Sequence, residues 1–442
     1  MHTILLVGAG RSSSSLISYL LTLCRDKKWN LVVGDVSQEA ALAKTKGDAS
    51  AKAILFDVNN ADQCESEVKN CSLVISLLPP HLHHLMAVEC IKQKKHFITA
   101  SYLSPEIQAL HEEAQNAGIL MLNECGLDPG IDHMSAMEVI NRLKADGCEL
   151  TAFRSYTGGL VAPESNDNPW GYKFSWNPRN VIVAGQGTAR YIRDGEYKYL
   201  PYNRLFTDIE TIRVDGVGSF DGYANRDSLA YRHHYTIENI PTLLRGTLRQ
   251  SGYCRAWDVF VKLGLTDDSF KVEHSEKLTY AQLIKAFLPG NFKSDNLVES
   301  VARFCGLPLD GEAMSKVTWT GIFEEELIGI SDASPAMILQ HLLEQKWKLQ
   351  PHDKDMIVMQ HQFEYVKNGE IKKLVSSLVV KGDDQIYTAM AKTVGLPLGI
   401  AAKLVLEVKI KITGVHIPVL KEIYEPILKE LEAFGINFVE SE

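Results

Sequence analysis

The sequence contains no Cys-x-x-Cys pair, although eight cysteines are scattered over its 442 residues. Cysteines without such spacing are typical of reduced thiols, and they argue against a disulfide framework or a structural zinc site. The chain also lacks a basic tract, because Lys and Arg number 46 against 55 Asp and Glu, a formal charge of −9. This balance disfavours nucleic acid and anionic membrane surfaces as partners. We therefore expect a cytoplasmic protein with neither kind of partner.

Long hydrophobic runs are missing too: no stretch of about eighteen uninterrupted apolar residues occurs, so the sequence predicts no membrane span. Residues 1–10 have neither a basic start nor a small-residue cleavage site, and we interpret them as a strand rather than a signal peptide. With 45% hydrophobic and 23% charged residues, the composition is that of an ordinary globular protein. Because the chain is too long for one core, we expect two or three domains.

The most informative feature is an apolar strand at 4–7 that runs directly into Gly8-x-Gly10, followed by a second apolar run that ends at Asp35. This is the pattern of a dinucleotide-binding βαβ unit. The first glycine permits a tight turn, and the second lets backbone amides approach a pyrophosphate at a helix N-terminus. The acid can accept hydrogen bonds from the adenosine ribose. The third small residue is Ser13 rather than glycine, and a Gly-x-Gly alone can also mark an ordinary turn.

Strands and helices alternate over 1–125 in the doubly wound manner. We expect strands at 4–7, 31–35, 53–56, 72–78, 96–100 and 119–122, and helices at 38–46, 61–69, 84–93 and 105–117. Such repeats form a Rossmann domain, which binds its ligands at the carboxyl ends of the strands. The segments 76–80, 101–103 and 124–130 should therefore face the cofactor cleft.

The rest of the chain follows a different pattern. Two strands at 356–365 and 372–380 are joined across Asn368-Gly369, which is a hairpin signal, while 255–350 show helical periodicity. The predicted fold class is α/β: a Rossmann doubly wound parallel sheet, a second mixed-sheet α+β domain and a helical insertion. We assign 1–130 and 390–442 to the Rossmann domain, 131–254 and 353–389 to a mixed-sheet substrate and dimerisation domain, and 255–352 to a helical domain.

The segment 124–133 is dense in polar residues and follows a Rossmann strand, so its loop should lie near the nicotinamide end of the cleft. Asp128 could accept a proton or bind an ammonium group, or it could cap the next helix. Asp132 fits an N-cap better than a catalytic role. His133 is more typical of a packed or exposed helix residue than of a catalyst.

Two further groups admit alternative interpretations. The histidines of His81-x-His83-His84 could suggest a metal, but no carboxylate or cysteine is near them in sequence, so they fit a helix start or the lining of the cleft better. We expect no metal. Arg226 and Arg249 carry guanidinium groups that bind carboxylates bidentately, although surface arginines are usually solvated.

The sequence resembles the saccharopine dehydrogenases that form L-glutamate, also called saccharopine reductases, over nearly its whole length. The likeness rests on Ala-Ser-Tyr at 100–102, Gly-Leu-Asp-Pro-Gly-Ile-Asp-His at 126–133, Gly-Gly-Leu-Val-Ala-Pro-Glu at 158–164, Asn-Pro-Trp-Gly-Tyr-Lys-Phe-Ser-Trp at 168–176, Asn-Arg-Asp-Ser at 225–228, Arg-Gly-Thr-Leu-Arg at 245–249 and Lys-Thr-Val-Gly-Leu-Pro at 392–397. Several long matches in the same order are far more specific than one glycine motif.

The resemblance implies a reversible oxidoreductase of lysine metabolism that oxidises saccharopine with NAD(P) and water to L-glutamate and 2-aminoadipate 6-semialdehyde. Its implied substrate contacts are Ser101, Tyr102, Asp128, Arg226, Thr247, Leu248 and Arg249. Together with the glycine motif, its implied cofactor contacts are Gly8, Gly10, Arg11, Ser12, Ser13, Asp35, Asp57, Val58, Ser76, Leu77, Leu127, Gly130 and Trp176. The family is often dimeric, which implies a homodimer.

Physical chemistry agrees with these roles. Saccharopine carries three carboxylates, and Arg226 and Arg249 supply the cationic forks that such a substrate needs. Its secondary amine must lose a proton before hydride leaves, and water must then be activated to attack the imine. Asp128 and Tyr102 are the titratable candidates for this catalytic work.

Two departures from the family pattern bear on mechanism. Fungal members carry an arginine where this chain has Asp35, and an acid at that place repels a 2′-phosphate and suits a free ribose hydroxyl. The sequence therefore predicts NAD as the cofactor, with NADP less favoured. Many members have a cysteine where this chain has Thr157, which argues against a required thiol there.

Two rival functions stay open. One is a related imine reductase, such as a carboxynorspermidine dehydrogenase, whose polyamine substrate would call for acidic residues rather than two arginines. The other is a non-catalytic NAD-binding regulator with the same fold. The joint presence of Tyr102, Asp128, Arg226 and Arg249 argues against a regulator.

Overall fold

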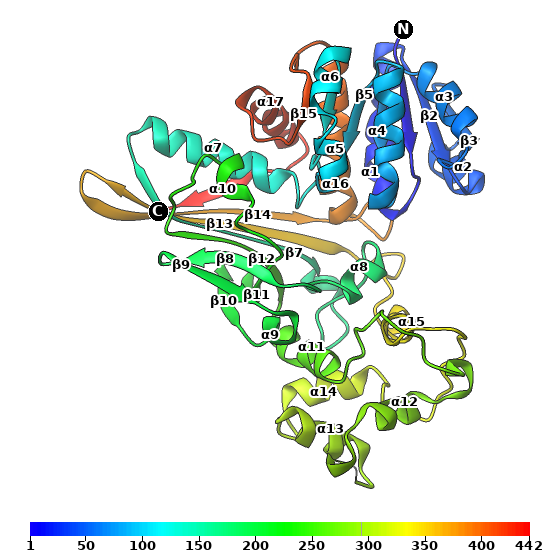
Figure 1. Ribbon diagram of the computed structural model, residues 1–442, viewed down its shortest axis with the longest axis vertical. Coiled ribbons are helices and arrows are strands. Elements are labelled where there is room, and N and C mark those ends of the chain that lie inside the picture. The colour runs from blue at the N-terminus through cyan, green and yellow to red at the C-terminus, as the bar shows by residue number, and fades with distance from the viewer. Residues whose placement is uncertain (293) are drawn as a thin grey trace. The chain divides into compact units, whose positions relative to one another are not determined.

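The computed structural model describes residues 1–292 and 294–442, which form two compact units. The first unit comprises 1–150, 366–370 and 378–441, and the second comprises 151–365, 371–377 and residue 442. Both units are drawn in Figure 1. The finer division into three domains, with a helical domain at 255–352, stays a prediction.

The first unit is built on a parallel sheet that confirms the predicted Rossmann fold. Its strands are β1 (Thr3–Val7), β2 (Asn30–Asp35), β3 (Ala51–Leu55), β4 (Leu73–Ser76), β5 (His96–Thr99), β6 (Leu120–Leu122) and β15 (Gly414–His416). They lie in the order β15-β6-β5-β4-β1-β2-β3, and the pairings along this order are parallel. The chain leaves β1 toward β2 and β3 and returns to the other side at β4. Ligands of doubly wound sheets bind at such a reversal, at the carboxyl ends of the strands.

The helices of this unit follow the predicted pattern with one exception. They are α1 (Ser14–Lys27), α2 (Gln38–Thr45), α3 (Ala61–Lys69), α4 (His83–Lys92), α5 (Pro105–Gln108), α6 (His111–Ala117), α7 (Ile131–Ala145), α16 (Ala389–Leu406) and α17 (Lys421–Glu432), and a last strand is β16 (Phe438–Ser441). The single helix expected at 105–117 is two helices, α5 and α6, separated by two residues. The side chains of Ser37 and Asn60 accept amide hydrogen bonds at the starts of α2 and α3, which fixes where these helices begin.

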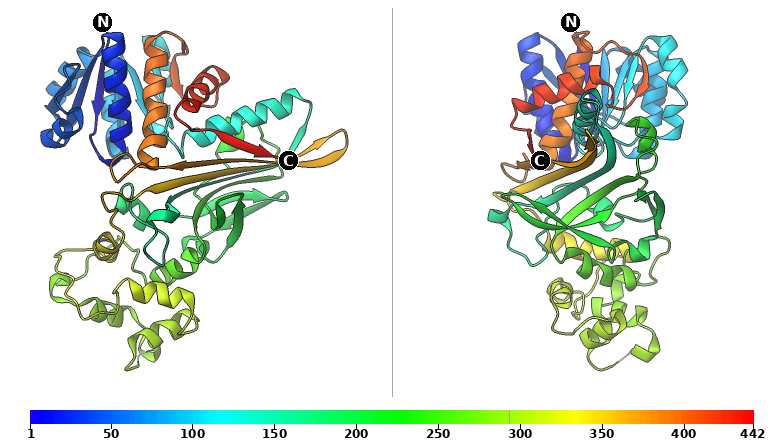
Figure 2. Two further views of the ribbon diagram at one scale, coloured as in Figure 1. Left: turned by 180° about the vertical axis from the view of Figure 1, so that it is seen from behind. Right: turned by 90° about the vertical axis from the view of Figure 1, so that its left-hand side faces the viewer.

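The first unit is layered because both faces of its parallel sheet are buried. Leu5 and Val7 belong to the apolar core with residues of α3, α4 and α6, while the alternate strand residues point to the opposite face. There α16 packs on α1, as Figure 2 shows. A Cβ on Gly395 would meet the Leu16 backbone nitrogen at 2.9 Å, so glycine permits the close approach. Helix α16 is long and apolar enough to cross a membrane by composition alone, but 83% of it is buried, as in the core helix of a globular protein.

The second unit contains the predicted mixed sheet. Its strands are β7 (Glu149–Val161), β8 (Ala189–Arg193), β9 (Glu196–Leu200), β10 (Ile209–Val214), β11 (Gly218–Ala224), β12 (Thr242–Gln250), β13 (Asp355–Lys367) and β14 (Glu370–Lys381). The strand order β10-β11-β12-β7-β13-β14-β16 combines an antiparallel β11–β12 pair with a parallel β12–β7 pair. The hairpin predicted at Asn368-Gly369 is confirmed, and both residues have the positive φ that this turn requires.

Helices and buried aromatic rings complete the second unit. Its helices are α8 (Pro178–Ile182), α9 (Tyr202–Leu205), α10 (Tyr231–His234), α11 (Tyr253–Lys262), α12 (Tyr280–Phe287), α13 (Leu297–Cys305), α14 (Glu312–Trp319) and α15 (Pro335–Lys346). Trp170, Trp257 and Trp347 are fully buried in one core that joins the sheet to these helices. The ring of Trp170 stacks on Phe260 with centroids 5.7 Å apart. Large rings bury much apolar area each, so this cluster anchors β12 and the start of α11 firmly.

Candidate active site

The glycine turn after β1 has the geometry of a dinucleotide cradle. Gly8 has φ 104°, and a Cβ at this position would lie 2.9 Å from the Leu77 carbonyl oxygen, so glycine is required. At Gly10 a Cβ would meet nothing within 4 Å, which leaves open space beside the backbone. The turn leads into a short 3-10 helix, η1 (Arg11–Ser13), and then into α1. These features fit a pyrophosphate at the N-terminal end of α1.

Asp35 ends β2 beside this turn, as predicted. Its Oδ2 accepts a hydrogen bond from the Ala9 amide at 2.6 Å, and its Oδ1 accepts one from the Ser37 amide at 2.9 Å. Both carboxylate oxygens are therefore engaged by backbone donors. They hold the glycine turn to the start of α2, and the donors offset the negative charge of the carboxylate.

A cation that the sequence analysis did not single out lies at the same turn. The ammonium group of Lys44, on the last turn of α2, contacts the Gly10 carbonyl and the hydroxyls of Ser13 at 3.0 Å and Ser14 at 2.9 Å. Burial of the ammonium lowers the pKa of Lys44 to about 8, although attraction to Asp35 acts in the opposite direction. Near neutral pH the turn thus carries a partly buried positive charge, which suits an anionic ligand.

The other predicted cofactor contacts of this unit lie after β1, β3, β4 and β6. Arg11 is exposed, Ser12 and Leu77 are half-buried, and Val58, Ser76, Leu127 and Gly130 are buried. The Asp57 carboxylate is exposed and accepts hydrogen bonds from the Asn59 amide at 2.9 Å and from its side chain at 3.0 Å. These residues follow the carboxyl ends of their strands, where a Rossmann cofactor binds.

The two predicted catalytic residues lie side by side. Tyr102 follows β5 and Asp128 follows β6, and both side chains are half-buried. The Tyr102 hydroxyl lies 3.5 Å from Asp128 Oδ1, at the outer limit of a hydrogen bond. Because β5 and β6 are neighbours in the sheet, the fold brings these loops to the same edge.

The turn that carries Asp128 is held by buried polar contacts. The Glu124 carboxylate accepts a hydrogen bond from the Leu103 amide at 2.9 Å and lies 2.8 Å from Nε2 of His133. Asp132 Oδ1 accepts from the Gly130 amide at 2.6 Å. The N-cap of α7 is Gly130 and Asp132 lies in the first turn, so the N-cap role expected for Asp132 is wrong. His133 is fully buried and packed. These contacts join the Tyr102 loop to the Asp128 turn.

The cluster His81-x-His83-His84 divides by environment. His83 is buried and bridges two serines, since its Nδ1 lies 2.8 Å from the Ser76 hydroxyl and its Nε2 lies 2.7 Å from the Ser101 hydroxyl. His81 is exposed and His84 is half-buried. Over 1–292 and 294–442, no group of three or more His, Cys, Asp or Glu side chains could hold a metal ion.

The second unit presents Arg249 from β12. This side chain is 5% exposed and lies over the rings of Tyr172 and Tyr253, at 5.4 and 5.6 Å from their centroids. One guanidinium nitrogen donates to the Leu248 carbonyl at 3.0 Å. Its Nε has no hydrogen-bond partner, and no carboxylate of the described residues forms an ion pair with the group. A buried cation in this condition is unfavourable until an anion reaches it.

The other predicted residues of the second unit differ in exposure. Arg226 is exposed and follows β11 with a φ of 44°. Thr247 is half-buried and Leu248 is fully buried, so Leu248 offers a ligand little side-chain surface. Trp176 is half-buried, and its Nε1 donates to the Tyr172 hydroxyl at 3.3 Å.

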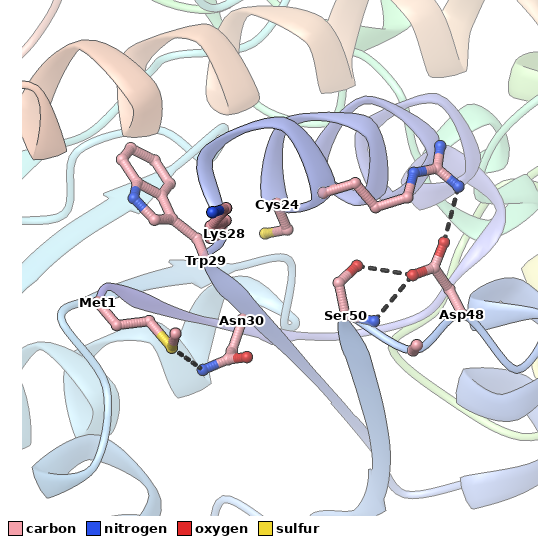
Figure 3. A pocket seen from close by; sticks show the side chains of 9 residues that line it. Met1, Cys24, Lys28, Trp29, Asn30, Asp48 and Ser50 are labelled. Atoms are coloured by element: carbon pink, nitrogen blue, oxygen red, sulfur yellow. Dashed lines mark hydrogen bonds and ion pairs between the residues drawn. The ribbon is translucent and has the colours of Figure 1, made fainter.

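Two hollows of the first unit contain none of the predicted residues. One of about 480 Å³ lies near the amino ends of β1 and β2 and is drawn in Figure 3. In it, Asp48 is already bonded to Arg25 at 2.9 Å and to the Ser50 hydroxyl at 2.7 Å. The other, of about 670 Å³, lies between α1, α16 and α17. The first hollow lies at the amino ends of the strands, whereas the glycine turn lies at the carboxyl end of β1. The first hollow is therefore not the cofactor site.

Two models of known protein families match the chain. Residues 4–122 match the family described as the saccharopine dehydrogenase NADP binding domain, and residues 126–436 match the saccharopine dehydrogenase C-terminal domain. The chain belongs to the saccharopine dehydrogenase family.

Individual relatives agree with this assignment. The chain is 33% identical to "Saccharopine dehydrogenase [NADP(+), L-glutamate-forming]" of Pyricularia oryzae over 98% of both chains. It is 37% identical to mitochondrial alpha-aminoadipic semialdehyde synthase of Bos taurus over 98% of this chain, but it spans only 47% of that protein. The apo structure of L-Glu-forming saccharopine dehydrogenase from Saccharomyces cerevisiae superposes with a TM-score of 0.89 at 32% identity, covering 100% of this chain and 99% of that one.

The predicted preference for NAD over NADP is wrong. The matched family is named for NADP binding, and the fungal saccharopine dehydrogenases are named for NADP(+). The structure gives a physical reason. Asp35 was expected to repel a 2′-phosphate, but both of its oxygens accept amide hydrogen bonds, and Lys44 places a cation at the same turn.

The sequence analysis of this saccharopine dehydrogenase family member did not single out Lys44. Lys44 belongs to no motif, and its contacts depend on a side chain that reaches from α2 to the start of α1. His83 was considered only within a histidine cluster, for which a helix start or the lining of the cleft was expected. Its position directly after Ser76 and the Pro-Pro turn was the available signal that it would face the cleft.

Proposed function

We propose that this chain oxidises saccharopine with NADP⁺ and water to L-glutamate and 2-aminoadipate 6-semialdehyde, in a reversible step of lysine metabolism. Membership of the saccharopine dehydrogenase family supports this proposal, as do the names of the full-length fungal relatives. The finer roles given below to individual residues are part of the proposal.

The observation that carries the proposal is the buried guanidinium of Arg249. It has an unsatisfied Nε and no anionic partner among the described residues, and aromatic rings flank it. A substrate carboxylate would supply both the missing acceptor and the missing charge. Saccharopine offers three carboxylates, whereas a polyamine would add ammonium groups, which Arg249 repels. Arg226, which is exposed, would bind a second carboxylate at the rim.

The proposed chemistry at the first unit needs a base near the substrate amine. The cofactor would accept hydride from the ε-carbon of the lysine moiety, which is the carbon that becomes the aldehyde, at the carboxyl ends of the strands. Asp128 would hold the substrate's secondary amine and orient the water that attacks the resulting imine. Tyr102, 3.5 Å from Asp128, would donate to or accept from the same groups. Water adds to the imine carbon, the C–N bond then breaks, and the amino group leaves with L-glutamate.

A direct assay tests the function. Purified protein would be mixed with saccharopine and NADP⁺, and the absorbance of reduced nicotinamide would be followed. We expect turnover with saccharopine and none with carboxynorspermidine. Preferential oxidation of carboxynorspermidine would favour the imine-reductase alternative, and NADP⁺ binding without any turnover would favour a regulator.

Lys44 provides a prediction about the cofactor. We expect Lys44→Met to weaken NADP⁺ binding by about tenfold to a hundredfold, because a charge-assisted contact to the 2′-phosphate is lost. Binding of NAD⁺, which lacks this phosphate, should change little. Titration calorimetry with both cofactors measures the difference. Lys46→Met is the matched control, since Lys46 is exposed and its ammonium lies 3.3 Å from the Tyr387 hydroxyl instead.

The same residue predicts a pH effect. Burial lowers the pKa of Lys44 to about 8, so the ammonium loses its charge as the pH rises through that value. Affinity for NADP⁺ should therefore fall above pH 8, while affinity for NAD⁺ should not follow. Equal weakening of both cofactors in Lys44→Met, or the same pH dependence for both, would remove Lys44 from phosphate recognition.

We also propose that the protein works as a cytoplasmic homodimer, without nucleic acid or membrane partners. The net charge of −9 supports the exclusion of polyanionic partners. The eight cysteines of the sequence are unpaired and buried in the structure, which is compatible with a reducing compartment.

A further inference from the structure

A buried histidine connects the cofactor edge to a predicted substrate contact in the first unit. His83, the first residue of α4, is 2% exposed. Its Nδ1 lies 2.8 Å from the hydroxyl of Ser76 at the end of β4, and its Nε2 lies 2.7 Å from the hydroxyl of Ser101 after β5. The ring packs edge-on against Phe97, which restricts its orientation. The three polar groups therefore form a continuous hydrogen-bonded chain at the carboxyl edge of the sheet.

The ring at the centre of this chain is neutral. Burial, assisted by the charge of nearby His81, lowers the pKa of His83 to about 4. A neutral imidazole carries one N–H, so it donates to one serine and accepts from the other. The direction of the whole chain is consequently set by which nitrogen holds the proton.

The environment of the two serines decides that direction. Ser76 is fully buried, and His83 Nδ1 is the only partner of its hydroxyl among the residues that the structure describes. If Nδ1 were protonated, the hydrogen of the Ser76 hydroxyl would be buried without an acceptor, which is unfavourable. If Ser76 donates to Nδ1, Nε2 carries the proton and donates to Ser101. Ser101 is half-buried, so its own hydrogen can then reach a ligand.

The backbone of Ser101 is already fixed. Its amide donates to the Thr99 hydroxyl at 3.2 Å, and its carbonyl accepts from the Glu124 amide at 3.0 Å. The hydroxyl is thus the adjustable part of the residue, and the histidine that donates to its oxygen sets where its hydrogen points.

We propose that His83 is a positioning residue: it donates to Ser101 from Nε2 and so fixes the Ser101 hydroxyl as a hydrogen-bond donor toward a substrate carboxylate. This inference rests on the proposed function for the identity of the substrate, but the direction of the hydrogen bonds does not depend on it. Acidic side chains could not replace the serine here, because they would repel a carboxylate.

The first test reads the proton directly. Protein labelled with ¹⁵N in its histidines would be studied by NMR at neutral pH, and the His83 signals would be assigned as those lost in His83→Leu. We expect the chemical shifts of a neutral ring protonated at Nε2. A ring protonated at Nδ1, or a charged ring, would overturn the proposal, whether or not the protein turns over saccharopine.

The second test measures the consequence for substrate. His83→Leu should raise the KM for saccharopine by about tenfold with little change in kcat, because the contact serves ground state and transition state alike. His83→Gln retains an N–H that can donate to Ser101 and should recover most of the loss. The Kd for NADP⁺ should stay within about twofold in both variants. His81→Gln, at the exposed neighbour, is the matched control.

A double-mutant cycle separates positioning from general structural damage. Ser101→Ala should raise KM at least as much as His83→Leu, and the double variant should be no worse than Ser101→Ala alone, because the histidine acts through that hydroxyl. Additive losses, or an equal weakening of NADP⁺ and saccharopine binding, would overturn the proposal. If the unaltered protein does not oxidise saccharopine, the proposed function fails, and the NMR result alone decides the role of His83.

Discussion

Replacement of Arg249 by methionine is expected to lower kcat/KM for saccharopine oxidation, because the substrate loses its partner in a desolvated site. The decrease should correspond to a loss of about 2–4 kcal/mol of transition-state stabilisation. The same change should leave the melting temperature unchanged or higher. Arg249 is buried without an ion pair among the described residues, and removing an uncompensated buried charge relieves an unfavourable term in folding. A large loss of activity with no loss of stability is the signature of a residue kept for its ligand.

The experiment needs steady-state kinetics and thermal unfolding on the same preparations. Arg204→Met is a matched control, since Arg204 is an exposed arginine of the second unit, and it should behave like the unaltered protein in both measurements. Arg226→Met should also weaken turnover, but less, because an exposed contact is screened by water. Normal saccharopine kinetics in Arg249→Met would show that the guanidinium is not a carboxylate anchor.

Asp128→Asn is expected to reduce the rate of saccharopine oxidation by about tenfold to a thousandfold, since the variant keeps the size of the side chain but loses its charge. The lower bound applies if the substrate amine carries its own proton. Oxidation by the unaltered protein should accelerate from neutral toward alkaline pH, because the secondary amine must be neutral before hydride leaves. Imine reduction should be relatively better near neutrality.

Profiles of kcat/KM against pH for the unaltered protein, Asp128→Asn and Tyr102→Phe distinguish the two candidates. The residue that moves a proton should alter the shape of the profile, whereas one that only positions substrate should lower the rate at every pH. Asp26→Asn, at an exposed acid of α1, controls for the loss of one negative charge. Unchanged rates and profiles in both site variants would leave the proton transfers to substrate and water.

The Rossmann fold was predictable because its signals are local. Apolar runs such as 4–7 and 96–100 read as buried strands of a parallel sheet, and a glycine turn followed by a helix identifies a βαβ unit. The Asn368-Gly369 hairpin was predictable for the same reason, since its turn requires a positive φ at both residues. Each of these features depends on neighbours within a few positions of the chain.

Less regular features were not predictable. Strand β15 extends the parallel sheet next to β6, but it has only three residues, too few to show a period. The helix expected at 105–117 is divided at residues 109–110. Ile107 and Ala114 are both buried in the core, but a continuous helix would also place them on one face, so periodicity did not reveal the break. Local pattern indicates that an element exists more reliably than it indicates where the element stops.

The sequence by itself determined the fold class, the location of the glycine cradle and the family of this protein, because these follow from local periodicity and from long ordered motifs. Only the tertiary structure decided how the polar side chains are paired. Asp35 was correctly placed but wrongly interpreted, since its acceptors are filled by amides of Ala9 and Ser37. Whether a charge is free to meet a ligand depends on burial and on partners distant in the chain, as Lys44, His83 and Arg249 show. Those properties arise only when separate segments meet, because desolvation and hydrogen bonding act through space and not along the sequence.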